Sequence, residues 1–471
     1  MNYKIIITTL IICLCAGLFC GCGIFGKKSE GDKRVDVSHI YETGSGTESD
    51  PYVITDCEEL NAVRLNPSYS YKLGNDIDLT NYNEDGSVRA NWVPIKKFSG
   101  KFDGDGHTVK GMGWTYNEDN KVSDTMQMGL FAYTNKATIK NLKLNVAISW
   151  KYSVKVDAEG NEKAYKLYVG ALVGEAHDTR FQNCDLYGVI VINEGLMTSF
   201  GGAVGYADSC YFENINSKMT LKLGALHACN IGGIVGESDC ARIKRCSYYG
   251  SITGKLSSDT DSNFIGGVVG KEISSSGVIE KTIVNDAMFD VFSYGGNRVT
   301  AATWVGLLVG YYKGSIKDSG ASGTMTGKEG LVSGIFRGVR HDVYLCGFGG
   351  KLLGRVENSY AYAKKCNMGD NTDGQESRYV HAYDFAHTVA ETLLSNIAYY
   401  DYDENIKLYN DRNGDPVYEH VNYAVYQKKG EILGDVTGYQ NVNNILTLGY
   451  DNLDENVWDL APSKDGLPKL L

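Results

Sequence analysis

The stretch IGGIVG, at Ile231–Gly236, decides the fold because close copies of it recur along the chain. The close copies are VGALVG at Val169–Gly174, FGGAVG at Phe200–Gly205, IGGVVG at Ile265–Gly270 and VGLLVG at Val305–Gly310, and the looser ones are MGLFAY at Met128–Tyr133 and GGKLLG at Gly349–Gly354. In the five close copies the first glycines stand at 170, 201, 232, 266 and 306, in steps of 31, 31, 34 and 40 residues. Repeats of this length are typical of solenoids and propellers.

Two further elements follow each copy of the phrase. The first places an apolar residue before two polar ones, as in Phe181-Gln182-Asn183, and the second is an alternating run such as Gly188–Ile192. Alternation of apolar and polar residues predicts strands with one buried face. No helical pattern separates these strands, which excludes a doubly wound α/β sheet. One repeat is therefore predicted to be three short strands joined by glycine or polar corners.

Stacking equivalent strands about 4.8 Å apart would pair every backbone group with the coils on either side. We therefore predict an all-β chain that forms a right-handed parallel β-helix, a solenoid with an N-terminal cap and a C-terminal cap containing a short helix. A propeller is less suitable, because its blades need about 40–50 residues. Side-chain amides at one corner are expected to stack as a ladder. The ladder residues are Asn141, Asn183, Asn214 and Asn358, with interruptions at Arg245, Lys281 and Asp318.

The glycine phrase with its following Asn resembles the GLUG motif of bacterial surface β-helix proteins. That group includes the non-catalytic regions of IgA-cleaving metallopeptidases. The resemblance covers roughly Met128–Asn358, and it implies a surface location and a β-helix rather than any reaction. The chain has no HExxH motif, so peptidase activity is not expected. His381 and His387 are interpreted as surface histidines.

The N-terminal residues predict export and lipid anchoring. Met1–Gly21 carries Lys4 and then the apolar run Ile5–Phe19, which is typical of a secretory signal peptide. Gly21 before Cys22 resembles a bacterial lipobox, with Cys22 as the acylated residue, although Phe19 stands where Leu is usual. The alternative is that the signal is cut elsewhere. We expect a bacterial cell-envelope protein, anchored to the membrane through lipid and exposed outside the cytoplasm.

Five segments are predicted along the chain. They are a lipoprotein signal peptide at 1–21, a flexible linker at 22–49, an N-terminal β-helix cap at 50–127, the GLUG-repeat β-helix at 128–366, and C-terminal coils and cap at 367–471. In the N-terminal cap, Asp56 is expected to cap a short helix at Cys57–Leu65. Asp103–His107 (DGDGH) is interpreted as a turn rather than a calcium loop, because no closing Glu or flanking helices follow.

The C-terminal segment carries the predicted cap. Tyr379–Asn396 has helical spacing through Phe385, Val389 and Leu393. Trp458 and Leu467-Pro468 are expected to cover the last coil.

Candidate chemistry is sparse. Asp178, Asp208 and Asp239 follow the phrase by three or four residues in successive coils and could form an acidic stripe, although turn capping explains them as well. No catalytic residue, metal site or cofactor is predicted, and no CxxC occurs after the leader. Cys210 and Cys240 lie near one corner of adjacent coils, where either a disulfide or two free thiols would be possible.

Two functions remain open. The net charge of −11 argues against nucleic acid as a partner. The first hypothesis is a lipid-anchored surface β-helix with a structural or adhesive role, binding a glycan or a cell-surface protein. The alternative is a polysaccharide lyase or glycosidase that uses acids in a lateral groove of the same scaffold. Thirty-three tyrosines could supply sugar-stacking rings, but tyrosine is also a common strand residue.

Overall fold

The computed structural model describes residues 36–80, 92–114, 125–150, 155–156, 162–163, 166–196, 198–257, 262–294, 302–330, 343–368, 380–383, 385–389, 394–400, 409–410, 416–417, 424–428, 431–433, 446–448, 454–459 and 469–471. The chain divides into two units, Met1–Asp36 and Val37–Leu471, and all described helices and strands lie in the second. The predicted signal peptide, Cys22 and nearly all of the linker up to residue 35 therefore lie outside the described residues.

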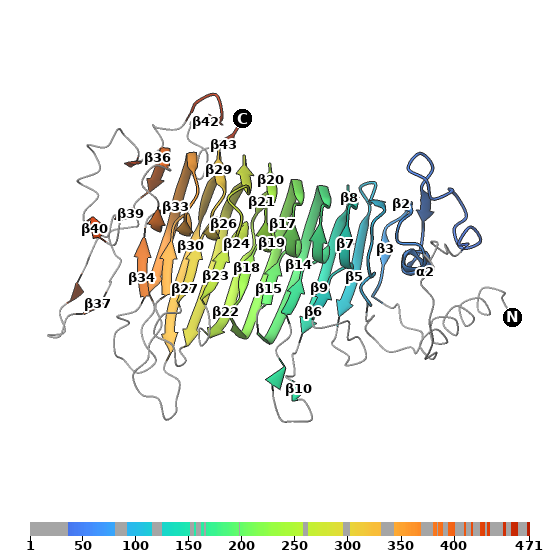
Figure 1. Ribbon diagram of the computed structural model, residues 1–471, viewed down its shortest axis with the longest axis horizontal. Coiled ribbons are helices and arrows are strands. Elements are labelled where there is room, and N and C mark those ends of the chain that lie inside the picture. The colour runs from blue at the N-terminus through green and yellow to red at the C-terminus, as the bar shows by residue number, and fades with distance from the viewer. Residues whose placement is uncertain are drawn as a thin grey trace, which may run out of the picture. The chain divides into compact units, whose positions relative to one another are not determined.

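Three large parallel sheets make up the second unit (Figure 1). The first sheet contains the strands that lead into the glycine phrases. They are β6 (Thr125–Met128), β12 (Lys166–Val169), β15 (Thr198–Gly201), β18 (Asn230–Gly232), β23 (Asn263–Gly266), β27 (Thr303–Gly306), β31 (Val343–Cys346) and β34 (Val380–Tyr383). Each pairs with the strand one repeat away, so that Phe200 aligns with Ile231 and Gly201 with Gly232.

The second sheet contains the strands that leave the glycine phrases. They are β7 (Phe131–Asn135), β13 (Val173–His177), β16 (Val204–Asp208), β19 (Val235–Asp239), β24 (Val269–Glu272), β28 (Val309–Tyr312), β32 (Gly349–Leu352), β35 (Ala386–Val389) and β39 (Ala424–Lys428), which also pairs antiparallel with β40 (Glu431–Leu433). The glycine phrase is thus the corner between the first and second sheets.

The third sheet contains the remaining strands of each coil, including those of the N-terminal segment. They are β1 (Tyr52–Ile54), β2 (Ser70–Leu73), β3 (Ile77–Asp78), β4 (Lys101–Asp103), β5 (Thr108–Trp114), β8 (Thr138–Lys140), β9 (Lys143–Trp150), β14 (Arg180–Leu196), β17 (Tyr211–His227), β20 (Arg242–Lys244), β21 (Ser247–Tyr248), β22 (Ser251–Ser257), β25 (Val278–Glu280), β26 (Ile283–Tyr294), β29 (Ser315–Lys317), β30 (Gly320–Gly330), β33 (Val356–Met368), β36 (Leu394–Tyr400) and β41 (Leu446–Leu448). The predicted all-β, solenoid-like stack of parallel strands is confirmed.

One copy of the phrase was assigned to the wrong residues. Leu345 pairs with Val305 and Gly349 with Val309, so the copy in this coil is LCGFGG at Leu345–Gly350 rather than GGKLLG at Gly349–Gly354. The adjacent glycines Gly349 and Gly350 look like the first residues of a glycine phrase. In the structure they are its last two residues.

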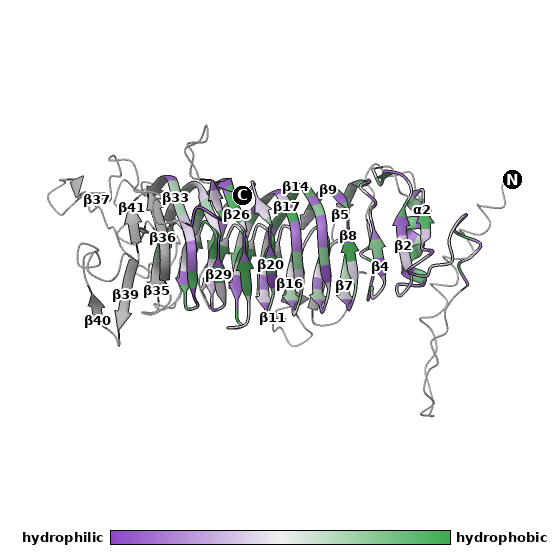
Figure 2. Ribbon diagram, turned by 90° about the horizontal axis from the view of Figure 1, so that it is seen from above, coloured by the Kyte–Doolittle hydropathy of each residue, from purple (hydrophilic) through white to green (hydrophobic). Residues whose placement is uncertain are grey.

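The core is built from equivalent apolar residues stacked along the sheets. Val169, Phe200, Ile231 and Ile265 occupy one position in successive coils, and all are fully buried. Each such side chain contributes about 1.5–3 kcal/mol of burial energy. Hydrophobic and hydrophilic residues alternate along the strands, as the colours in Figure 2 show. This alternation leaves one face of each strand available for function.

The acid Glu272 is fully buried in the core. Glu272 ends β24, is 0% exposed and aligns with Ser238 before it and Tyr312 after it. Its carboxylate accepts hydrogen bonds from the Ser238 hydroxyl (2.7 Å) and from the backbone N–H groups of Cys240 (3.0 Å), Ala241 (3.3 Å) and Ser274 (2.8 Å). Burial nevertheless raises the pKa of Glu272. The carboxylate satisfies corner N–H groups that no strand partner reaches.

The N-terminal segment adds coils to the stack. Helix α2 (Cys57–Ala62) and the 3₁₀ turn η1 (Val63–Leu65) follow Asp56, whose side chain accepts from the Glu59 N–H, so the predicted capped helix is confirmed. The strands from β1 to β5 pair in parallel with each other and with the repeat coils. Residues from Val37 to Val63 lie at the beginning of the same buried core.

The predicted C-terminal helix is wrong. The described residues of Tyr379–Asn396 belong to strands β34, β35 and β36, which pair with β31, β32 and β33. Phe385 stacks on Phe348 of the preceding coil, with ring centroids 4.6 Å apart. The segment forms another coil, in which Ala386 aligns with Gly349 of the preceding coil. Its helical spacing does not decide its conformation, because the free edges of β31 and β32 pair with it as strands.

Trp458 lies against the side of the stack. It is 1% exposed, contacts the Tyr360 ring edge-on at 5.2 Å, and its Nε1 donates to the Asn358 carbonyl at 3.2 Å. Strand β42 (Trp458–Asp459) pairs antiparallel with β43 (Lys469–Leu470). The expectation that Trp458 covers the last coil is wrong, because its partners lie on β33, before β36 and β41.

Candidate ligand-binding face

The last glycine of each phrase allows two strands to approach closely. A Cβ on Gly205 would lie 2.4 Å from the backbone N of Val169, and one on Gly236 would lie 2.4 Å from that of Phe200. In each case the second-sheet strand lies directly against the first-sheet strand of the preceding coil. This approach requires glycine, and it brings the outward side chains of the two sheets together.

Two rows of side chains result, and together we call them the two-row face; most of the first row is buried, and the second row is half-buried. The first row comes one residue before the apolar residue that opens each phrase, and the second comes one residue after the phrase's last small residue. The first row is Gln127, Tyr168, Ser199, Asn230, Phe264, Trp304 and Tyr344, and the second is Tyr133, Glu175, Tyr206, Glu237, Lys271, Tyr311 and Lys351. Each residue aligns with its equivalent in the next coil.

Aromatic rings make contact along this face. Tyr168 stacks on Tyr206 with centroids 5.1 Å apart, and Trp304 stacks on Tyr344 at 4.1 Å. Phe264 of the first row meets Tyr311 of the second edge-on at 5.2 Å. Burial raises the pKa of Tyr206 to about 12, so its hydroxyl stays protonated and can donate a hydrogen bond at neutral pH.

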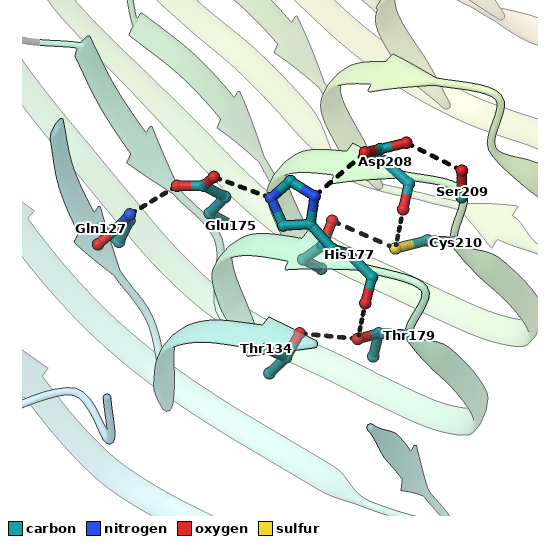
Figure 3. A network of polar contacts seen from close by, with 9 residues as sticks. Gln127, Thr134, Glu175, His177, Thr179, Asp208, Ser209 and Cys210 are labelled. Atoms are coloured by element: carbon teal, nitrogen blue, oxygen red, sulfur yellow. Dashed lines mark hydrogen bonds and ion pairs between the residues drawn. The ribbon is translucent and has the colours of Figure 1, made fainter. Parts of the chain in front are cut away.

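The coils nearer the N-terminus carry acids. His177 lies between two carboxylates, with Nε2 2.9 Å from Glu175 Oε1 and Nδ1 3.1 Å from Asp208 Oδ2 (Figure 3). Gln127 donates to the other Glu175 oxygen at 2.5 Å. The Tyr133 ring lies 5.2 Å from the imidazole.

The charge state of His177 follows from this arrangement. Burial by itself would lower the pKa of His177. The hydrogen bonds and negative charges of Glu175 and Asp208 outweigh that effect and raise the pKa above its usual value of 6.5. The imidazole therefore tends to carry a positive charge that joins the two carboxylates.

The predicted acidic stripe is formed only in part. Asp208 and Asp239 align in successive coils, as expected. Asp178, however, is one residue further along, at an exposed corner with φ of 45°, and His177 takes its place beside Asp208. The row is therefore Asn135, His177, Asp208 and Asp239, in which the histidine separates the acids from the next polar side chain.

The asparagine ladder is present in the structure. The amide of Asn183 donates to Asn141 at 3.0 Å, and that of Asn214 donates to Asn183 at 2.8 Å. All of the ladder positions have a φ of 48° to 54°, Asn358 included. The expected break at Arg245 is wrong, because its Nε donates to Asn214 at 3.1 Å. Asp318 is linked on one side, since Asn358 donates to it at 2.6 Å, while Lys281 has no side-chain hydrogen bond to Arg245 or Asp318 among the described residues.

Other candidates show no reactive arrangement among the described residues. Cys210 and Cys240 are free thiols, and burial raises the pKa of Cys210 to about 12. Asp103–His107 forms a turn in which the His107 N–H donates to the Gly104 carbonyl at 2.8 Å. Within the ranges described, no three His, Cys, Asp or Glu side chains are grouped as a metal site. The side chains of His381 and His387 and residue Cys22 are outside those ranges.

The two-row face was missed from the sequence, although a signal for it exists. Residues on either side of the phrases are often aromatic, as in Tyr168, Tyr206, Trp304 and Tyr311. In the sequence, these flanking positions cannot be distinguished from any other solvent-facing position of a strand. Only the angle between the two sheets makes them neighbours.

No protein-family model matches the chain. It is 28% identical over 179 residues to halomucin of Haloquadratum walsbyi, covering 35% of this chain and 2% of that protein. It is 31% identical over 114 residues to a protein of Evansella cellulosilytica provisionally named a Gly-rich membrane protein, covering 23% of this chain and 12% of that protein. The chain thus spans a small part of the length of these curated relatives.

Solved structures similar to the chain include an IgA1 protease, with a TM-score of 0.34 and 16% identity over 72% of this chain and 21% of that one. Another is a Bacteroides ovatus protein provisionally named an immunoglobulin A1 protease, with a TM-score of 0.31 and 14% identity over 92% of this chain and 95% of that one. At these scores the similarity carries no argument about function. In the described part of the chain no helix is long and apolar enough to cross a membrane.

Proposed function

We propose that this chain is a surface-displayed, right-handed parallel β-helix that binds a carbohydrate chain along the two-row face. Parallel strand connections are right-handed in nearly all known cases, which supports the proposed hand. One observation carries the binding proposal: aromatic rings from successive coils touch along two adjacent rows, as in the Tyr168–Tyr206 and Trp304–Tyr344 pairs.

Carbohydrate suits this arrangement better than a protein partner. Sugar rings stack their C–H faces on aromatic rings and form hydrogen bonds with carboxylates and amides. The two-row face carries aromatic rings and also carboxylate and amide groups. Among the latter, Ser199 and Asn230 donate hydrogen bonds to Glu237 at 2.7 and 2.9 Å. An extended polymer with a regular repeat matches a surface whose own side chains recur at every coil.

A glycan array followed by calorimetry tests the proposal. Tyr206→Ala and Tyr311→Ala should each weaken binding of the best array ligand by roughly tenfold, as expected for the loss of one aromatic stacking contact. Tyr249→Ala is the matched control, because Tyr249 is 45% exposed and follows strand β21 in the third sheet. A blank array, or equal losses for all three variants, would exclude the two-row face as the binding surface.

We also propose that the chain is anchored to the bacterial envelope through acylation of Cys22. Support comes from the apolar run Ile5–Phe19 ahead of Gly21-Cys22. Cys22→Ala should release the protein from the membrane fraction and abolish incorporation of labelled palmitate. A Cys20→Ala variant is the control and should stay in the membrane fraction. Retention of Cys22→Ala with its label would rule out this anchor.

A second candidate, glycoside cleavage, is favoured by the cluster of Glu175, His177 and Asp208 beside Tyr133 and Tyr206. Both carboxylates are held by His177, which would have to release one of them for acid–base catalysis. Chromatography of the bound glycan after prolonged incubation tests this. Shortened products that disappear with Asp208→Asn would establish cleavage, and an unchanged glycan would leave binding alone.

A further inference from the structure

Three lysines lie on aromatic rings at the C-terminal end of the two-row face: Lys271 and Lys351 belong to the face, and Lys313 lies beside it. Lys271 Nζ is 5.5 Å from the Phe264 ring centroid, and Lys351 Nζ is 4.2 Å from that of Trp304. Lys313 Nζ lies 5.9 Å from the ring of Tyr311, between the other two coils. Lys271 and Lys351 are two coils apart, which is about 10 Å along the stack.

Among the described residues none of these lysines forms an ion pair, although Glu237 is the register neighbour of Lys271. In the described part of the chain, no carboxylate oxygen lies within 4.0 Å of Lys271, Lys313 or Lys351. Other outward lysines do have such partners: Lys244 lies 3.3 Å from Glu280, and Lys317 lies 3.8 Å from Glu357.

The environment of Lys351 favours a bound anion. It is partly buried against Trp304, and burial lowers its pKa. A ring face offsets only part of the cost of removing an ammonium group from water. A negative group at this place would supply the missing charge, and an ammonium on a flexible stem is a common binder of anionic oxygens.

The two ends of the face therefore differ in charge. The coils of Glu175, Asp208 and Glu237 are acidic, and the coils of Lys271, Lys313 and Lys351 are basic, while aromatic rings continue through both. A ligand that is anionic along its whole length would meet repulsion at the acidic end. An anionic sugar bound at the lysine end would meet complementary charge and a stacking ring in the same coil.

We propose that the Lys271–Lys351 end of the two-row face binds acidic sugars, through uronate carboxylates or sulfate esters, with a sugar ring stacked on the half-buried ring of Tyr311. This inference rests on the proposed carbohydrate binding and assigns its chemical class and its position. Affinity for the anionic sugar should fall steeply with ionic strength, because the lysines are partly solvated.

Calorimetry on the purified full chain tests this with three probes: an oligogalacturonate, its fully methyl-esterified form and a sulfated heparin-type oligosaccharide. The ester keeps the sugar rings and removes the charge. Lys271→Met and Lys351→Met retain most of the apolar stem and should each weaken binding of an anionic probe by roughly tenfold, the loss expected for one hydrogen bond to a charged group. Tighter binding of the uronate or of the sulfated probe would identify which anion the site prefers.

Lys218→Met is the matched control. Lys218 Nζ also lies on tyrosine rings, at 6.0 Å from both Tyr187 and Tyr249, but on the exposed face of the third sheet. This variant should bind as the parent chain does, and thermal melting should show that all variants are folded. Equal losses for Lys218→Met and Lys351→Met would overturn the proposed position.

The outcomes separate this inference from the proposed function. Equal affinity for the acid and its ester, with no effect of Lys271→Met or Lys351→Met but weakened binding by Tyr206→Ala, would overturn the anionic site and leave carbohydrate binding standing. If neither anionic probe binds but a neutral glycan binds on the array, the anionic site is likewise overturned and carbohydrate binding stands. Failure of every glycan would overturn both proposals.

Discussion

Single charged side chains define the chemistry of this solenoid, because most of its surroundings are apolar or backbone. Glu272 is inside the core, Lys351 lies on the two-row face, and His177 lies beside that face. In each case the neighbours decide whether the charge is tolerated. Glu272 has N–H donors, His177 has two acids, and Lys351 has a ring face but no acid among the described residues.

We expect Glu272→Ala to destabilise the fold strongly. The change leaves the N–H groups of Cys240, Ala241 and Ser274 without their acceptor, and each buried unsatisfied donor costs about 1–3 kcal/mol. Urea unfolding should show a loss of about 3 kcal/mol or more. Glu280→Ala is the control, since this acid forms only a half-exposed pair with Lys244, and it should cost at most about 1 kcal/mol. Equal losses would contradict the structural role of Glu272.

We expect the contribution of His177 to stability to depend on pH. Its pKa is raised in the folded chain, so protonation favours folding, and the effect is fully present below the usual pKa of 6.5 and lost as pH rises through the folded value. His177→Gln should therefore lower the free energy of unfolding at pH 5 by about 1 kcal/mol or less, and by a smaller amount at pH 9.

Urea unfolding across this pH range checks the expectation for His177. A double variant, Glu175→Gln with Asp208→Asn, removes both negative partners and should flatten the same pH window. A difference between His177→Gln and the parent that grows with pH would refute the assigned direction of the pKa shift.

At the scale of elements, the corners add side-chain contacts between coils to the backbone pairing that sets their register. The ladder residues adopt a left-handed φ near 50°, a conformation that costs most L-residues about 1–2 kcal/mol and that Asn tolerates better. Their amides then form hydrogen bonds from coil to coil, from Asn141 to Arg245. The corner thus combines a backbone requirement with a side-chain contact between neighbouring coils.

Two substitutions at Asn214 separate these contributions. Asn214→Gly keeps the φ of 54° accessible and loses the side-chain hydrogen bonds to Asn183 and Arg245, so it should cost about 1 kcal/mol. Asn214→Ala loses the same bonds and adds backbone strain, so it should cost about 1–2 kcal/mol more. Thermal unfolding measures both, and an alanine variant as stable as the glycine variant would show that the strain is absent.

At the scale of the whole folded unit, the chain returns to the side of its own stack. The hairpin β42–β43 places Trp458 on Tyr360 and Asn358, about a hundred residues earlier in the sequence, and the Asp454 N–H donates to Asn358 Oδ1 at 2.7 Å. The last ladder residue, Asn358, is thereby covered by the hairpin residues Asp454 and Trp458.

Trp458→Ala should destabilise the coils near β33 more than the rest of the stack. Removing a fully buried Trp costs about 3–5 kcal/mol. Hydrogen exchange should show faster exchange around Asn358 and Tyr360 with little change around Phe181, because a solenoid's contacts are made mainly between neighbouring coils. A uniform increase in exchange throughout the chain would instead indicate that the stack unfolds as a single unit.

Several features of this protein followed from the sequence alone. The repeating phrase predicted parallel coils, Asp56 predicted the capped helix after it, and Asn183 and Asn214 predicted the ladder. These signals are local: glycine and asparagine are needed where φ is positive, and alternation marks a half-buried strand. Each holds for one coil regardless of how the others are placed.

Other features were decided only by the tertiary structure. The segments before and after Phe385 form strands because the preceding coil offers them a pairing edge, although the spacing of Phe385, Val389 and Leu393 suits a helix. Asp178 leaves the acidic row, and His177 enters it, because register is set by backbone pairing rather than by distance from the phrase. Lys351 contacts Trp304 because two sheets approach each other at a glycine corner. The approach of two sheets depends on residues of different coils, so no single stretch of sequence predicts it.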